Sequence, residues 1–120
     1  MKICVVGTGY VGLVTAVTLA AKRHEVTCVD IDKAKVEKLN RAEATIFEEQ
    51  LPELLKSTTA AKMLSATTDL KTAIQNAEMC IICVGTPSKP NGDIDLSQVE
   101  SASKQIGEAL KEKKGFLSIV

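Results

Sequence analysis

Residues 2–13 read KICVVGTGYVGL. The run Lys2–Val6 is apolar and rich in β-branched residues, a pattern typical of a parallel strand covered on both faces. Gly7 follows at once, and an apolar helical pattern extends from about Val11 to Lys22. This segment therefore predicts a strand, a glycine-bearing turn and a helix in direct succession.

The turn contains Gly7, Gly9 and Gly12 in the G-x-G-x-x-G spacing of a dinucleotide-binding loop. In such a loop Gly7 permits the tight turn, Gly9 lets the main chain approach a pyrophosphate, and Gly12 lets helix and strand pack closely. The helix N-terminus offers unpaired N–H groups and a partial positive charge to the diphosphate. A turn that binds nothing is the alternative, and the strand and helix on either side of it disfavour that interpretation.

Asp30 ends the second predicted strand, where a carboxylate can accept hydrogen bonds from both ribose hydroxyls of an adenosine. A phosphate on the ribose 2′-oxygen would be repelled by this carboxylate. Ile31 brings no guanidinium to offset the repulsion, so the pattern favours NAD over NADP as the cofactor.

Two further residues are candidates whose roles the local pattern leaves open. Lys35, one turn into the next helix, either approaches the adenosine ribose or a phosphate, or belongs to a solvated face. Thr86 follows the fourth predicted strand, where it either presents its hydroxyl or backbone to the second ribose or simply helps to end the strand.

The rest of the chain alternates short strands with helices, which predicts one α/β domain over residues 1–120. We expect a doubly wound parallel sheet, Rossmann-like, with strand order 3-2-1-4-5 and truncated before a sixth strand. Asp32 and Asp69 are predicted helix caps, and Asp95 with Gln98 forms a capping-box signature. The other predicted strands are Val26–Asp30, Leu64–Thr67, Met79–Val84 and Phe116–Val120, and the other predicted helices are 32–41, 48–62, 69–76 and 95–113.

Composition and charge exclude several classes of protein. Hydrophobic residues make up 45% and charged residues 25%, and fifteen basic residues balance fifteen acidic ones, so neither a disordered tail nor a nucleic-acid-binding surface is indicated. The apolar runs are too short to span a bilayer, and the N-terminus lacks the pattern of a signal peptide. We therefore expect a cytoplasmic protein that contacts neither nucleic acid nor membrane.

The chain has four cysteines, each inside a short apolar run, where a thiol behaves as a small buried hydrophobe. Cys80 and Cys83 have C-x-x-C spacing, but an offset of three in a strand turns their side chains to opposite faces, so no metal site is expected. His24, the only histidine, is predicted at the end of the sheet opposite the crevice. No residue set for catalysis is apparent.

Several motifs together resemble a known family, the UDP-glucose/GDP-mannose dehydrogenases, over nearly the whole chain. GTGYVGL at Gly7–Leu13 is similar to that family's G-x-G-Y-V-G-L loop, and CVDID at Cys28–Asp32 is similar to its second strand. CVGTP at Cys83–Pro87, followed by Gly92, Asp95-Leu96-Ser97 and Val99, resembles its V-G-T-P…G…D-L-S-x-V segment.

The resemblance implies the N-terminal NAD-binding domain of a nucleotide-sugar 6-dehydrogenase, which oxidises a UDP- or GDP-sugar alcohol to a uronic acid with two NAD. It assigns NAD contacts to the glycine loop and to Tyr10, Val11, Asp30, Lys35 and Thr86. The family's catalytic cysteine and sugar-nucleotide domain would lie beyond residue 120, so we expect this chain alone to be inactive. We also expect it to self-associate through the open edge at Phe116–Val120.

Three departures from the family pattern stand out. Arg23 replaces the glycine that usually precedes the histidine, Asn40-Arg41-Ala42 replaces asparagine-x-glycine, and Glu48-Glu49-Gln50-Leu51 replaces glutamate-proline-glycine-leucine. At Arg23 we expect the left-handed residue at the helix end to be either strained or rebuilt. Because these changes lie away from the pyrophosphate loop, NAD binding is expected to survive them where full catalysis is not.

Two other functions are compatible with the glycine loop and a strand-end aspartate. One is an NAD-sensing regulatory module resembling those attached to potassium transport, and the other is the NAD-binding domain of a different dehydrogenase. The V-G-T-P segment argues against the first. The combination of Tyr10-Val11 with Thr86-Pro87 argues against the second.

Overall fold

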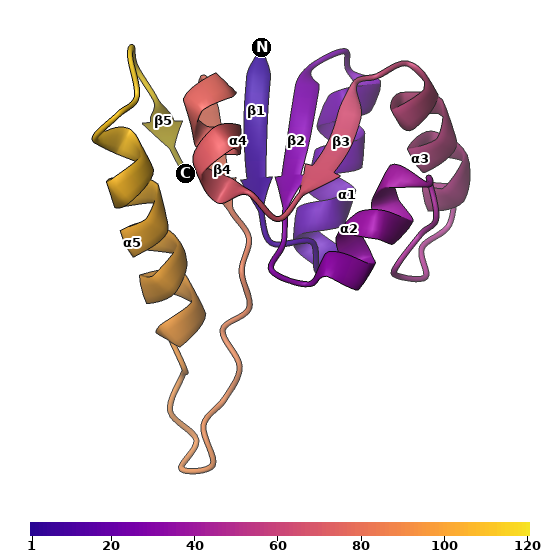
Figure 1. Cartoon of the computed structure of the whole chain (residues 1–120). Coiled ribbons are helices and arrows are strands. Elements are labelled where there is room, and N and C mark those ends of the chain that lie inside the picture. Colours follow the sequence, from indigo (N-terminus) through magenta and orange to yellow (C-terminus); the bar gives the residue numbers. More distant parts are fainter.

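The computed structural model describes residues 1–120 as a five-stranded parallel sheet with helices on both faces (Figure 1). The strand order is β3-β2-β1-β4-β5, which confirms the predicted doubly wound topology. The strands are β1 (Lys2–Val6), β2 (Glu25–Val29), β3 (Leu64–Thr67), β4 (Met79–Ile82) and β5 (Ser118–Ile119). The helices are α1 (Tyr10–Ala21), α2 (Lys33–Asn40), α3 (Leu51–Ala60), α4 (Leu70–Asn76) and α5 (Ser97–Leu110).

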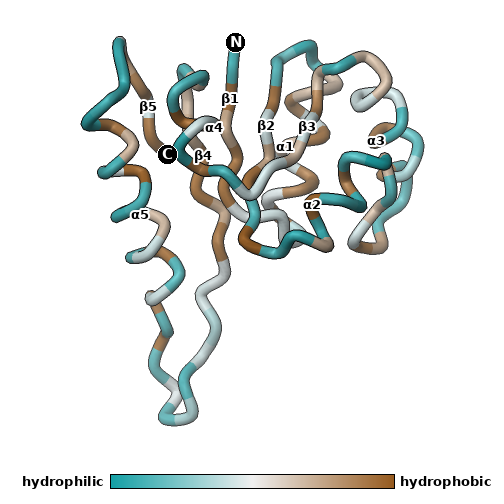
Figure 2. The backbone as a smooth tube through the Cα atoms, in the orientation of Figure 1, coloured by the Kyte–Doolittle hydropathy of each residue, from teal (hydrophilic) through white to brown (hydrophobic).

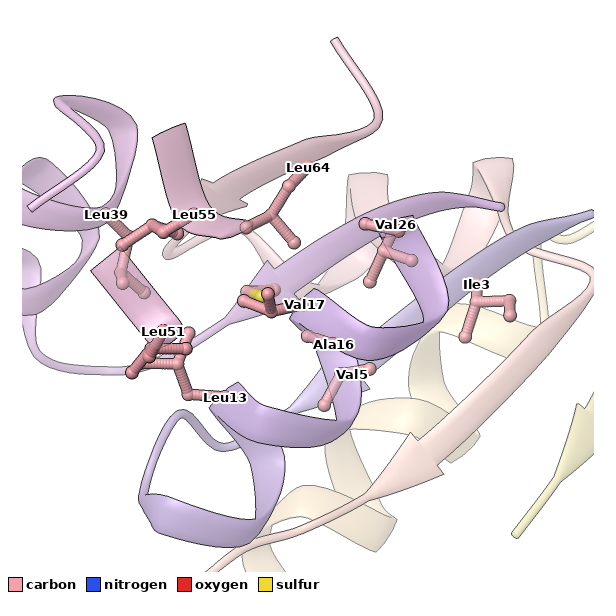
Figure 3. Close-up of a cluster of buried hydrophobic side chains, with 12 residues drawn as sticks. Ile3, Val5, Leu13, Ala16, Val17, Val26, Leu39, Leu51, Leu55 and Leu64 are labelled. Atoms are coloured by element: carbon pink, nitrogen blue, oxygen red, sulfur yellow. The ribbon is translucent and has the colours of Figure 1, made fainter. Parts of the chain in front are cut away.

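One face of the sheet is covered by α1, α2 and α3. Their apolar side chains meet those of β1, β2 and β3 in a buried cluster, of which Figure 3 shows Val5 of β1 beside Leu13 and Ala16 of α1. Leu13 and Leu55 are completely buried. Burying such a side chain contributes roughly 1.5–3 kcal/mol, so this cluster is a main source of stability.

The other face is covered by α4 and α5, whose buried residues form a second cluster with Cys4, Val6 and Cys80 from the sheet. Apolar residues follow the strands and the inner helix faces in Figure 2, and polar ones lie outside. Because β1 pairs with both β2 and β4, it lies in the middle of the sheet and is apolar on both faces. The continuous run Lys2–Val6 reflects that position.

Two predicted strands are shorter in the structure. The fourth ends at Ile82 rather than Val84, because its neighbour β1 ends at Val6, the partner of Ile82 in the register. The fifth contains only Ser118–Ile119, since Phe116 precedes the sheet and is 84% exposed.

Two predicted helices also begin later than the pattern suggested. Gln50 has a left-handed backbone (φ 67°), so α3 starts at Leu51 and not at Glu48. The prediction of a capping box at Asp95 was wrong, because Leu96 and not Asp95 is the N-cap of α5. Asp95 Oδ1 instead accepts a hydrogen bond from the Ser97 amide at 2.9 Å, a local turn that competes with capping.

At the three altered positions where the family pattern has glycine, this chain has another residue, but the backbone is still left-handed. Arg23, Ala42 and Gln50 have φ values of 71°, 58° and 67°. A side chain in this conformation is disfavoured by contact between Cβ and the following carbonyl. The strain expected at Arg23 is thus present at all three departures.

Candidate cofactor-binding site

A crevice of about 1090 Å³ opens at the carboxyl ends of β1, β2 and β4. Seven of the eight predicted site residues line it, namely Gly7, Gly9, Tyr10, Val11, Asp30, Lys35 and Thr86. The eighth, Gly12, lies behind the loop against Gly7. This is the end of an open α/β sheet at which ligands bind, beside the point where the strand order reverses.

Gly7 and Gly12 are required by close backbone packing. Gly7 has a φ of 98°, and a Cβ there would lie 2.5 Å from the Cys83 carbonyl oxygen. A Cβ on Gly12 would lie 1.9 Å from the carbonyl oxygen of Gly7. Neither position accepts a side chain while β1, the loop and α1 keep this arrangement.

Gly9 differs from the other two glycines, because its φ of −70° suits any residue and no atom lies within 4 Å of where its Cβ would be. It is the N-cap of α1, and no side chain caps the helix. The first N–H groups of α1 therefore lack a side-chain acceptor, and the space beside them is open. Free helix N–H groups beside open space fit the diphosphate of a dinucleotide.

Asp30 follows β2 and is held by three hydrogen bonds. Its Oδ2 accepts the Thr8 hydroxyl at 2.5 Å and the Thr8 amide at 3.0 Å, and its Oδ1 accepts the Asp32 amide at 2.9 Å. Partial burial alone would raise the pKa of Asp30, but these hydrogen bonds and the charge of Lys35 outweigh it and hold the pKa below its usual value. The carboxylate is thus ionised at neutral pH.

Lys35 and Ile31 lie beside this carboxylate at the crevice. Lys35 is in the first turn of α2, which Asp32 caps by accepting the amides of Ala34 and Lys35. Ile31 is 92% exposed and offers an apolar surface. Among the crevice-lining side chains Lys35 is the one cation, and no arginine is present to receive a 2′-phosphate.

The opposite wall of the crevice was missed by the sequence analysis. It comes from α5, whose Ser97, Gln98, Ser101 and Gln105 line the crevice. The amide of Gln98 lies 3.4 Å from where a Cβ on Gly85 would be. Polar residues at helical spacing in the helix that follows the V-G-T-P segment and its loop are the signal that could have revealed this wall.

Three of the four thiols lie away from the crevice, and the fourth, Cys83, lines it. Cys4, Cys28 and Cys80 are fully buried and Cys83 is partly buried, with Cys80 and Cys83 in the clusters on opposite faces, as predicted. Burial, with a smaller effect of Asp30, raises the pKa of Cys28 to about 12. His24 lies at the other end of the sheet, where its Nδ1 is 2.9 Å from the N-terminal amine.

Comparison with known sequences identifies the family. The model of the UDP-glucose/GDP-mannose dehydrogenase family, NAD binding domain, matches residues 1–119. The chain belongs to this family. The resemblance of the motifs is therefore confirmed, and NAD is the cofactor of the domain.

Relatives within the UDP-glucose/GDP-mannose dehydrogenases match over nearly the full chain. GDP-mannose 6-dehydrogenase from Pseudomonas aeruginosa is 43% identical over 120 residues, which are all of this chain and 28% of that protein. UDP-glucose 6-dehydrogenase from Bacillus subtilis is 41% identical over 111 residues, 92% of this chain and 25% of that protein. The chain thus spans about a quarter of the length of these dehydrogenases.

Solved structures of the same family have the same fold. The structure of a ternary complex of GDP-mannose dehydrogenase from Pseudomonas aeruginosa superimposes with a TM-score of 0.97 at 41% identity, over 99% of this chain and 27% of that one. A UDP-glucose dehydrogenase from Pyrobaculum islandicum gives 0.90 at 32% identity, over 98% and 28%. No helix of the present structure has the length and apolar character needed to cross a membrane.

Proposed function

We propose that residues 1–120 form one NAD-binding domain in which eight residues hold the cofactor. The observation that carries this proposal is the open space at Gly9, in front of the uncapped N-terminus of α1, with the ionised Asp30 nearby. The diphosphate would bind to the helix N–H groups, and the adenosine ribose would bind to Asp30. The proposed cofactor-binding residues are Gly7, Gly9, Tyr10, Val11, Gly12, Asp30, Lys35 and Thr86.

We further propose that the domain serves a nucleotide-sugar 6-dehydrogenase. When bound, NAD would supply hydride-accepting chemistry: two NAD+ and one water would convert the primary alcohol of a UDP- or GDP-sugar to a carboxylate, with two NADH and three protons as the other products. The proposed cofactor site contains one thiol, Cys83, and burial raises its pKa, which disfavours the thiolate that a nucleophilic cysteine needs. We therefore expect NAD binding without sugar oxidation when this chain is studied alone.

The discriminating experiment is a thermal unfolding titration of the purified chain with NAD and, in parallel, NADP. A ligand at about a hundred times its dissociation constant stabilises the folded state by ~2.7 kcal/mol, which is a readily measured rise in melting temperature. We expect NAD to raise the melting temperature and NADP to raise it much less. Equal responses to both would remove Asp30 from the proposed ribose site, and no response to NAD would refute the function.

Two properties beyond cofactor binding are also proposed. The four free thiols suit a reducing compartment, which favours a cytoplasmic location. The strand β5 lies at the edge of the sheet. Ile119 in this strand is 47% exposed and Phe116 nearby is 84% exposed, which favours self-association through that edge. Light scattering over a range of concentrations would test the association, and a constant monomer mass would refute it.

A further inference from the structure

Thr8 is a polar residue buried inside the glycine loop. It lies between Gly7 and Gly9 and is 1% exposed, in contrast to Tyr10 and Val11, which are mostly exposed. A buried hydroxyl is unfavourable unless it forms a hydrogen bond. Here the hydroxyl donates to Asp30 Oδ2 at 2.5 Å, and the Thr8 amide donates to the same oxygen at 3.0 Å. Thr8 therefore directs both of its donors at one carboxylate oxygen.

The Asp30 carboxylate is consequently held from two sides. The glycine loop holds Oδ2 through Thr8, and the turn into α2 holds Oδ1 through the Asp32 amide at 2.9 Å. An ionised carboxylate has about four acceptor sites, two on each oxygen. Oδ2 has both of its sites filled, whereas Oδ1 has one filled. The oxygen with a site left for a ligand is Oδ1.

We propose that Thr8 is a positioning residue for the cofactor, whose hydroxyl fixes the Asp30 carboxylate so that Oδ1 accepts a ribose hydroxyl of NAD. This inference rests on the proposed function and adds a residue that acts through Asp30. Without the Thr8 hydroxyl, Oδ2 regains an acceptor site, and the carboxylate is held less firmly, by the Thr8 and Asp32 amides alone. Binding would then have to order the carboxylate, which weakens affinity.

The surroundings of Asp30 contain few other groups that could hold it. Lys35 from α2 contributes a favourable charge, and Cys28 lies behind it in β2. Asp32 is engaged as the cap of α2, and the glycine loop brings no charged side chain. Among side chains, Thr8 is thus the one that hydrogen-bonds to this carboxylate.

The test compares Thr8→Val, which replaces the hydroxyl by a methyl group of similar size, with Thr8→Ser, which restores a hydroxyl. The matched control is Thr58→Val, because Thr58 is also buried but its hydroxyl bonds to the Leu54 carbonyl of α3, away from the crevice. NAD affinity would be measured by isothermal titration calorimetry. We expect about tenfold weaker binding for Thr8→Val, the loss of one charged hydrogen bond, and wild-type affinity within about threefold for the other two variants.

A second readout needs no ligand. The pKa of the Asp30 carboxyl, followed by carbon NMR, should rise in Thr8→Val and return towards the wild-type value in Thr8→Ser. NAD affinity within about twofold of the wild type in Thr8→Val would overturn the inference while leaving the proposed function intact. If the wild-type chain bound no NAD, the proposed function would fail. An unchanged Asp30 pKa in Thr8→Val would then overturn the positioning role as well.

Discussion

The hydroxyl of Tyr10, at the start of α1, donates a hydrogen bond to the carboxylate of Glu48 in the segment before α3. This contact joins the glycine loop to the segment in which the family's glutamate-proline-glycine-leucine is altered. The hydrogen bond and the negative charge of Glu48 both stabilise the protonated phenol, so they raise the pKa of Tyr10 above its usual value.

This contact can be tested by spectroscopy, because Tyr10 is the one tyrosine and the chain has no tryptophan. In Glu48→Gln we expect the pKa of Tyr10 to fall towards that of a free tyrosine. Ultraviolet absorbance of the tyrosinate, followed during a pH titration, measures it directly. Glu49→Gln is the matched control and should titrate as the wild type does. Identical curves for the wild type and Glu48→Gln would show that the two side chains do not meet in solution.

Substitution of Gly12 should destabilise the fold, whereas substitution of a helical glycine elsewhere should not. In Gly12→Ala the new Cβ meets the Gly7 carbonyl oxygen at 1.9 Å, and backbone must move, at a cost of about 3 kcal/mol or more. Gly107, inside α5, has no atom within 4 Å of the place a Cβ would take, so Gly107→Ala should stabilise by about 0.5–1 kcal/mol. Urea unfolding would measure both, and equal stability of the two variants would contradict the packing argument.

Gly9→Ala should separate binding from folding. No neighbouring atom lies within 4 Å of the added Cβ and φ is −70°, so the fold should be kept, with a slightly lower melting temperature because alanine is a poorer N-cap than glycine. The methyl group would occupy the space proposed for the diphosphate, and we expect NAD binding to weaken at least about tenfold, or ~1.4 kcal/mol. Calorimetric titration is the measurement, and full NAD affinity in this variant would place the diphosphate elsewhere.

Asp30 should make stability depend on pH in one direction. Its pKa is lowered in the folded state, so the unfolded chain binds more protons in the range just below pH ~4. The contribution of Asp30 is present above the unfolded pKa and is lost as the pH falls through the folded pKa. Urea unfolding of the wild type and Asp30→Asn at pH 7 and at pH 3 should show a difference that shrinks at the lower pH. If the difference in the free energy of unfolding grew on acidification, the pKa of Asp30 would be raised by folding and not lowered.

Restoring glycine at the strained positions should stabilise the chain. Arg23 and Gln50 have φ values of 71° and 67°, and we expect Arg23→Gly and Gln50→Gly each to gain about 1 kcal/mol. Arg41 has a φ of −89°, so Arg41→Gly relieves no strain and should lower stability slightly. Melting temperatures of the three variants test this, and a loss at all three sites would exclude backbone strain as a factor.

Strand positions were the most predictable part of the fold. The bounds of β1 and β3 agree with the prediction because each lies in a register with neighbours along its full length. The start of α5 was not predictable. Asp95 can either cap a helix or form a local turn, and the path of the loop 83–96 decides between the two. β5 is short since Phe116 stays outside the sheet, which no local pattern in Phe116–Val120 indicates.

The candidate site was predictable where the chemistry is local. The glycine loop and Asp30 are motifs within short segments, and the structure brings them to one crevice. Thr8 was overlooked because its partner Asp30 comes from another strand, and the pairing exists only once β1 and β2 are side by side. The wall formed by Gln98 and Ser101 was overlooked although its polar residues recur at helical spacing within α5.

The central position of β1 also has a consequence for the order of events during synthesis. β1 is synthesised before the other strands of this sheet, but its partner β4 follows only after β2 and β3, and the Cys83 amide then bonds to the Val6 carbonyl at 2.7 Å. Until that moment the turn at Gly7 has no neighbour on its β4 side. The surroundings of the glycine loop are therefore completed only after β4 has been synthesised and paired with β1.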